Sequence, residues 1–107
     1  MKEIRIVVRP QLLERLHEAL RGCPGFPGMT VGEVNGYPPV ASQASAHSIK
    51  DDLTEFVPRV RIELVVSDAL ASMLFDAAVK VLEHGQTGDS AIWMTDVVQA
   101  TFLHRTG

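Results

Sequence analysis

Hydrophobic and polar residues alternate in several short segments of the chain, and the segments between them repeat apolar residues at helical spacing. A period of two is typical of a strand with one buried face, whereas recurrence every three or four residues is typical of an amphipathic helix. The alternating segments are residues 2–9, 29–35, 56–66 and 92–98, with 101–104 expected to extend the sheet edge. The helical segments carry apolar stripes over residues 12–23 and 70–82.

Residues at the ends of these segments favour the same boundaries. Pro10 follows the first strand and suits the first turn of a helix, where its missing N–H is not needed. Ser67 or Asp68 is expected to cap the second helix. Gly32 is expected to weaken the second strand or to place a bulge in it. Residues 36–55 show almost no periodicity and predict a long loop, a feature that is usually functional or disordered.

The predicted order of elements is strand, helix, strand, long loop, strand, helix, strand. This is the order of the α+β ferredoxin-like fold, βαββαβ, in which two helices cover one face of an antiparallel sheet. The other face should carry the outward residues of the strands, which are Arg5, Val7, Arg9, Arg61, Glu63 and Val65. Charged and apolar side chains mixed on a broad sheet predict that another subunit covers it. The alternative is a polar face in contact with water.

Length and composition favour one globular domain over residues 1–107. Hydrophobic residues make up 46% and charged residues 21%, close to the globular average. The formal net charge of −3 argues against a nucleic-acid partner, which would favour a basic chain. The single cysteine cannot form an internal disulfide, so a reducing, cytoplasmic location is expected. No apolar run approaches the roughly 18 residues of a membrane span, so direct membrane insertion is not expected.

Few side chains suggest catalysis or metal binding by their spacing. The four histidines are scattered, and the chain has neither zinc-ligand spacing nor a nucleophile or Walker motif. His47 lies in the long loop near Asp51, so these two residues are candidate ligands for a divalent metal, with a solvated loop as the alternative. Cys23 lies on the apolar stripe of the first helix, as a buried inert thiol would. The chain is therefore not expected to be an enzyme. An acylphosphatase-like hydrolase is a further hypothesis, although that family's glycine-rich loop is missing.

Several blocks of the sequence resemble the PII signal-transduction family, and the similarity runs nearly end to end. The blocks are Met1-Lys2-Glu3-Ile4 with Arg9-Pro10, Gly28-Met29-Thr30-Val31 with Glu33-Val34-Asn35-Gly36-Tyr37, Phe56 to Val66, Gly85-Gln86-Thr87-Gly88-Asp89 and Arg105-Thr106-Gly107. The spacing between these blocks changes by single residues only. The resemblance implies the ferredoxin-like fold, assembly as a homotrimer, and effector binding in clefts between subunits.

The resemblance also implies which residues take part in the function. Residues 37–55 correspond to the T-loop, through which members of the family contact a transporter, an enzyme or another regulator. An adenine nucleotide (ATP, ADP or AMP) is the implied effector, and no cofactor is obligatory. The implied pocket residues are Val7, Gly28, Met29, Thr30, Gly36, Glu63, Gly85, Gly88 and Asp89, and Arg59, Arg61 and Arg105 would hold the anionic end of the ligand.

The chain departs from the family at positions that matter for phosphate binding. Ala91 replaces the lysine of the family's phosphate loop, and of two arginines expected near residues 102–105 only Arg105 is present. Each lost cation removes a charge-assisted contact of roughly 1.5–3 kcal/mol, so ADP or AMP would lose less than ATP. Pro38 and Pro39 replace the glutamine that helps to bind 2-oxoglutarate.

A second departure points to an alternative function. The segment Pro24-Gly25-Phe26-Pro27-Gly28 is similar to that of a PII-like subgroup associated with heavy-metal efflux transporters. A metal-responsive trimer, related to the copper-tolerance proteins of the same fold, is therefore the alternative. In that function His47 with Asp51 or Asp52 would hold a divalent metal.

Overall fold

The structure, a computed structural model, describes residues 1–37, 56–84 and 90–103. Within these residues, four strands and two α-helices follow one another in the predicted order. The strands are β1 (Lys2–Val8), β2 (Thr30–Gly36), β3 (Val57–Val66) and β4 (Ala91–Asp96). The helices are the 3₁₀ turn η1 (Pro10–Leu12), α1 (Leu13–Arg21) and α3 (Asp68–Glu83).

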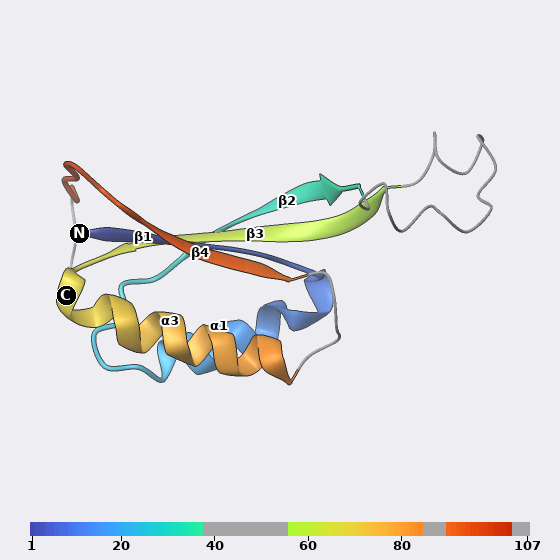
Figure 1. The fold of residues 1–107 in the computed structure, drawn as a ribbon, viewed down its shortest axis with the longest axis horizontal. Coiled ribbons are helices and arrows are strands. Elements are labelled where there is room, and N and C mark those ends of the chain that lie inside the picture. The colour runs from blue at the N-terminus through green and yellow to red at the C-terminus, as the bar shows by residue number, and fades with distance from the viewer. Residues whose placement is uncertain (38–55, 85–89, 104–107) are drawn as a thin grey trace.

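The strands form one antiparallel sheet in the order β2-β3-β1-β4, and both α-helices lie against the same face of it (Figure 1). This arrangement confirms the predicted α+β ferredoxin-like fold. The central pair is β1 with β3. Strand β2 pairs with β3 only from Thr30 opposite Glu63 onward, so residues 64–66 of β3 extend beyond the beginning of β2.

The hydrophobic core lies between the sheet and the helix layer. Side chains alternate along a strand, and the even-numbered residues from 4 to 8 of β1 and from 60 to 66 of β3 are buried on the side of the helices. Ile6 and Ile62, at the centre of the sheet, are 0% exposed. The helices add residues spaced by three or four positions. The core consists of Ile4, Ile6, Val8, Leu12, Leu16, Leu20, Val60, Ile62, Leu64, Val66, Ala71, Leu74 and Ala78.

The helices begin and end close to the predicted positions. Pro10 occupies the first turn, and Ser67 occupies the N-cap of α3 in an extended conformation, although its side chain makes no capping hydrogen bond. Cys23 is half-buried rather than buried, and its thiol donates to the carbonyl of Ala19 at 3.6 Å. In the part of the chain that the structure describes, no helix is both long and apolar enough to cross a membrane.

Two details of the strand prediction are wrong. Residues 101–103 form no strand: β4 ends at Asp96, opposite Lys2, the first residue of β1. One further bond runs from the N–H of Val97 to the carbonyl of Met1 at 3.0 Å, and the chain then leaves the sheet. Gly32 carries no bulge, since β2 pairs with β3 without a break. A Cβ at Gly32 would have no neighbour within 4 Å, so the glycine leaves open space on the surface of the sheet. The pairing of β2 with β3 continues past it.

Candidate functional site

The face of the sheet opposite the helices carries most of the candidate residues that the structure describes, and we call it the open face. Directly paired residues of antiparallel strands point to the same side, so the register assigns side chains to this face. Two rows cross all four strands on it, Thr30-Glu63-Arg5-Trp93 and Gly32-Arg61-Val7-Ala91. The open face mixes charged and apolar side chains as the sequence predicted.

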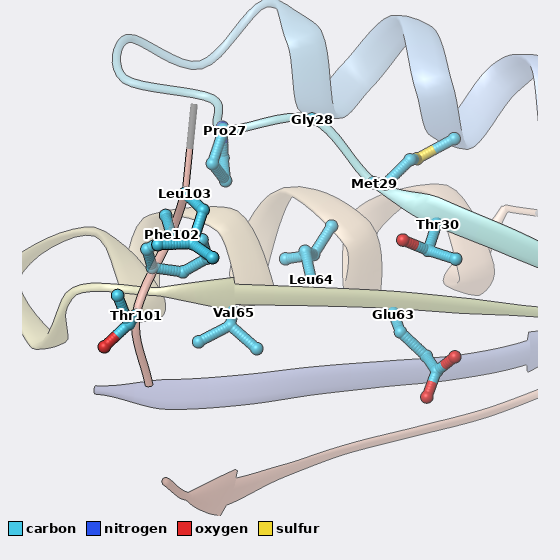
Figure 2. Close-up of a pocket in the computed structure, with 10 residues that line it drawn as sticks. All are labelled: Pro27, Gly28, Met29, Thr30, Glu63, Leu64, Val65, Thr101, Phe102 and Leu103. Atoms are coloured by element: carbon cyan, nitrogen blue, oxygen red, sulfur yellow. The ribbon is translucent and has the colours of Figure 1, made fainter. Parts of the chain in front are cut away.

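A pocket of about 710 Å³ lies at the edge of the sheet, where β2 begins and the C-terminal segment passes β3 (Figure 2). Glu63 and Val65 point to one side of β3 and Leu64 to the other (Figure 2). The pocket is lined by Pro27, Gly28, Met29, Thr30, Glu63, Leu64, Val65, Thr101, Phe102 and Leu103. Small-molecule sites typically have volumes of about 300–1,000 Å³, so this pocket has the size for such a ligand. Four of the sequence candidates lie together in it: Gly28, Met29, Thr30 and Glu63.

Two glycines shape the connection from α1 to this pocket. Gly25 and Gly28 have φ angles of 83° and 93°, in the left-handed region that side chains other than hydrogen disfavour. A Cβ at Gly25 would lie 2.9 Å from Cδ1 of Leu70, so the connection packs closely on α3 there. A Cβ at Gly28 would have no neighbour within 4 Å, because that glycine faces the pocket.

Four charged side chains form a network beside the pocket. Nη2 of Arg5 lies 2.9 Å from Oε2 of Glu63 and 3.2 Å from Oε2 of Glu3, and Nε of Arg61 lies 3.8 Å from Oε1 of Glu63. Two arginines and two glutamates carry no net charge together. Nε of Arg5 is buried and has no hydrogen-bond acceptor among the described residues. A buried N–H without a partner costs about 1–3 kcal/mol, so we expect an acceptor from elsewhere.

The other described candidates lie on the open face but outside the pocket. Val7 and Arg61 are direct cross-strand partners in the row next to Glu63. Gly36 lies where β2 ends, and a Cβ there would lie 3.2 Å from Cγ of Arg59. Arg59 is 8% exposed and donates from Nη1 to the carbonyl of Pro58 at 3.0 Å. Four residues along β3 span about 13 Å, so within one chain Arg59 does not reach the pocket at Glu63.

An aromatic pair marks the beginning and end of the predicted T-loop. The ring centroids of Tyr37 and Phe56 are 6.3 Å apart, and the two residues are 70% and 48% exposed. They stand one position beyond the last β2–β3 pair, Gly36 opposite Val57. Tyr37 and Phe56 therefore lie side by side, while residues 38–55 between them lie outside the described residues.

Six predicted site residues lie outside the described residues. They are Gly85, Gly88, Asp89 and Arg105 of the effector site, and His47 and Asp51 of the metal site. Among residues 1–37, 56–84 and 90–103, no group of three or more His, Cys, Asp or Glu side chains is placed to hold a metal ion. The metal site therefore stays a prediction from the sequence.

The wall of the pocket that the C-terminal segment forms was not predicted from the sequence. Thr101, Phe102 and Leu103 belong to a segment that we expected to extend the sheet edge, and Pro27 belongs to the connection that we interpreted as similar to a metal-efflux subgroup and not as part of a pocket. One feature of the sequence could have indicated this wall. The apolar pair Phe102 and Leu103 stands in the stretch where the resemblance implies arginines. Both residues keep exposed apolar surface at the pocket, 42% for Phe102 and 76% for Leu103.

An ion pair joins the end of β4 to the start of β1. Lys2 and Asp96 are cross-strand partners, and their side chains form a hydrogen-bonded ion pair. The hydrogen bond from Lys2, and then its charge, lower the pKa of Asp96. The same hydrogen bond and the carboxylate charge raise the pKa of Lys2. Because solvent screens exposed ion pairs, this one contributes little to stability.

Comparisons with known proteins place the same chain among regulators. The family model of nitrogen regulatory protein P-II matches residues 1–107. Nitrogen regulatory protein P-II of Klebsiella oxytoca is 32% identical over 107 residues, which cover all of this chain and 94% of that protein. The protein of the same name from Bradyrhizobium diazoefficiens is 31% identical with the same coverage. Nitrogen regulatory protein P-II 1 of Escherichia coli is 32% identical, again over all of this chain and 94% of the relative.

Proposed function

This chain belongs to the nitrogen regulatory protein P-II family, whose members are signal-transduction regulators and not enzymes, and from that premise we propose how it regulates. It assembles as a homotrimer and binds a small effector, an adenine nucleotide or a similar compound, at clefts between subunits. Through residues 37–55 it contacts a partner, which is a transporter or an enzyme.

One observation carries the effector part of this proposal. Gly28, Met29, Thr30 and Glu63 were chosen from the sequence, and they line a single pocket of about 710 Å³. Gly28, Met29 and Thr30 are consecutive, at the end of the connection and the start of β2, whereas Glu63 lies on β3 and more than thirty positions later, so their meeting depends on the β2–β3 register. The pocket opens at the sheet edge, where a second subunit can complete it.

The open face supports assembly into a trimer. Its central rows combine Trp93, 40% exposed, and Val7 with a charge network whose Arg5 Nε lacks an acceptor among the described residues. A second copy of the chain would cover the apolar groups and supply the acceptor. Closed symmetric assemblies of identical chains are the usual way to complete such a face.

The strands β2 and β3 connect the effector pocket to the loop that contacts the partner. Strand β2 begins at the pocket with Thr30 and ends at the loop with Gly36, and β3 returns from the loop to Glu63. A ligand that fixes Thr30 and Glu63 therefore acts on both strands that hold the ends of the loop. We propose that it shifts the loop between ordered and disordered states, a known mode of switching.

Titration calorimetry with ATP, ADP and AMP tests the effector part. We expect saturable binding of at least one nucleotide, and a loss of about tenfold in affinity in Glu63→Gln, because a charge-assisted hydrogen bond contributes roughly 1.5–3 kcal/mol. Glu14→Gln, an exposed change on α1 and away from the pocket, is the control and should bind like the unchanged protein. No heat and no thermal shift with all three nucleotides would contradict the proposal.

A further inference from the structure

We propose that the groove between α1 and α3 is a second ligand site, which binds an elongated amphipathic carboxylate with its headgroup at one end and its aliphatic tail along the helices. The groove and the pocket at Glu63 share no lining residue among the described residues. The inference therefore goes beyond the proposed function, which uses the pocket, the open face and the T-loop.

The groove has the size of a small-molecule site and opens away from the core. Its volume is about 550 Å³, within the range of about 300–1,000 Å³ that is typical of such sites. Four of its lining residues stand one position before a buried core residue, which is about a quarter of a helical turn from it. These four are Arg15 and Ala19 on α1, and Met73 and Ala77 on α3. The groove therefore runs between the two helices, beside the core and accessible to solvent.

The two ends of the groove differ in chemistry. Figure 1 shows α1 and α3 side by side and running in opposite directions, so the start of α1 lies beside the end of α3. Arg15 and Lys80 therefore stand at one end, and Cys23 and Met73 stand at the other. Met73 and Lys80 are seven positions apart on α3, which is a rise of about 10 Å. A ligand that fills the groove is therefore elongated, with a different group at each end.

Small and apolar side chains line the groove away from the cations. Ala19 and Ala77 are half-buried and carry only a methyl group, which leaves the hollow between the helices. Beyond them, Met73 is 38% exposed and the thiol of Cys23 is half-buried. A thioether is flexible and adapts to an aliphatic neighbour. An aliphatic tail would remove these groups from water, and that burial favours binding in proportion to the apolar area covered.

The end with Arg15 and Lys80 favours an anionic headgroup. Both side chains are exposed, and neither forms an ion pair with any residue that the structure describes. His84 lines the groove at the same end, and an imidazole N–H can donate to a carboxylate. Asp76 is the one carboxylate among the described lining residues, and it lies one turn from Lys80 toward the middle of the groove. A single carboxylate therefore fits between the two cations, and Asp76 opposes the reverse orientation.

Calorimetry on the full chain with decanoate, decanol and butyrate, below the concentration at which decanoate forms micelles, tests the headgroup. We expect saturable binding of decanoate, about tenfold tighter than decanol, because exposed charges contribute modestly and two cations face the headgroup. Removing both cations, with Arg15→Gln and Lys80→Gln together, should abolish that tenfold difference. Asp76→Asn should raise the affinity for decanoate about twofold to threefold. Opposite effects at exposed positions are not expected from a loss of folding.

The position of the tail is tested separately. Butyrate should bind about a hundredfold more weakly than decanoate, because each buried CH₂ adds to affinity. Ala77→Leu fills the groove and should weaken decanoate binding about tenfold, since overpacking forces neighbours apart. Ser72→Leu adds the same side chain at an exposed position of α3 outside the lining, and should bind decanoate like the unchanged protein.

The single cysteine reports on the far end of the groove. Cys23 is the only thiol in the chain, so alkylation by iodoacetamide reads out its accessibility directly. Saturating decanoate should slow this alkylation severalfold, because its tail reaches Cys23. Butyrate, whose chain ends well before Cys23, should leave the rate unchanged.

Several results would overturn the inference. Equal affinity for decanoate and decanol would show that the cations take no part. Equal losses in Ala77→Leu and Ser72→Leu, or an unchanged alkylation rate with decanoate bound, would place the ligand outside the groove. No binding of decanoate would also overturn it, while binding of ATP, ADP or AMP, measured on the same samples, would still decide the proposed effector site independently.

Discussion

The two faces of the sheet are made by the same strands, yet one chain completes only one of them. Toward the helices, Ile6 and Ile62 are 0% exposed and belong to a closed apolar core. On the open face, their strand neighbours Arg5 and Arg61 pair with Glu63, and Trp93 is 40% exposed. The difference separates two tasks. The covered face supplies the stability of the chain. We place assembly on the open face and effector binding at the edge of the sheet beside it.

Truncation on the covered face should have the largest effect. Ile62→Ala removes a fully buried side chain and leaves a cavity, so the free energy of unfolding should fall by about 2–5 kcal/mol. Urea unfolding at several protein concentrations measures it, and the loss should be present at every concentration. A loss below about 1 kcal/mol would mean that the core is less closely packed than we describe.

Truncation on the open face should weaken assembly instead. Trp93→Ala removes an aromatic anchor from the proposed subunit contact, and such anchors contribute about 2 kcal/mol or more, which is roughly a thirtyfold rise in the dissociation constant. Sedimentation equilibrium measures it. Met73→Ala is a matched control, because Met73 is 38% exposed but lies on α3, on the opposite side of the sheet. Equal effects of the two variants would contradict the assignment of the interface to the open face.

The connection between α1 and β2 allows a smaller comparison, between a glycine that packs on α3 and a glycine that faces the pocket. Gly25→Ala combines the strain of a positive φ with a 2.9 Å contact to Leu70 of α3, and should cost about 2–3 kcal/mol. Gly28→Ala meets only the strain and should cost about 1 kcal/mol, because the pocket leaves room for its methyl group. Thermal unfolding of both variants compares them. Equal losses would show that Leu70 moves aside without cost.

The alternation of residues was enough to predict the faces of the sheet, because the period of two is a local property of each strand. The pairing of Arg5 with Glu63 required the register of β1 against β3, which alternation alone does not supply. The C-terminal wall of the pocket was missed for a similar reason. Residues 101–103 have strand-like composition, but β4 ends at Asp96, opposite the first residue of β1, and residues 101–103 lie outside the sheet.

The resemblance to a family identified site residues that the hydrophobic pattern alone could not identify. It selected Gly28, Met29, Thr30 and Glu63, which meet in the pocket, because a family motif preserves residues that are distant in sequence and close in space. It also selected Arg59, which lies about 13 Å along β3 from Glu63 and is 8% exposed. In a cleft between subunits, residues of different chains lie close together, so a distance within one chain does not decide which residues share the cleft.

The smallest effect concerns the ion pair at the sheet edge. The pKa of Asp96 is lowered, so the pair stabilises the fold above the ordinary pKa of an aspartate and loses this effect as the pH falls through the lowered value. The pKa of Lys2 is raised, so the pair persists until the pH rises through that raised value. Asp96→Asn should therefore lower the melting temperature slightly at neutral pH, and the difference should vanish in acid. High salt should also reduce it, and a difference that survives in acid would contradict the ion-pair explanation.

The mass of the protein in solution tests the central claim most directly. If copies of the chain complete the open face, sedimentation equilibrium of the unchanged protein should give three times the 11.7 kDa of one chain. The mass of a single chain at all concentrations, even with saturating adenosine or ATP, would contradict the account.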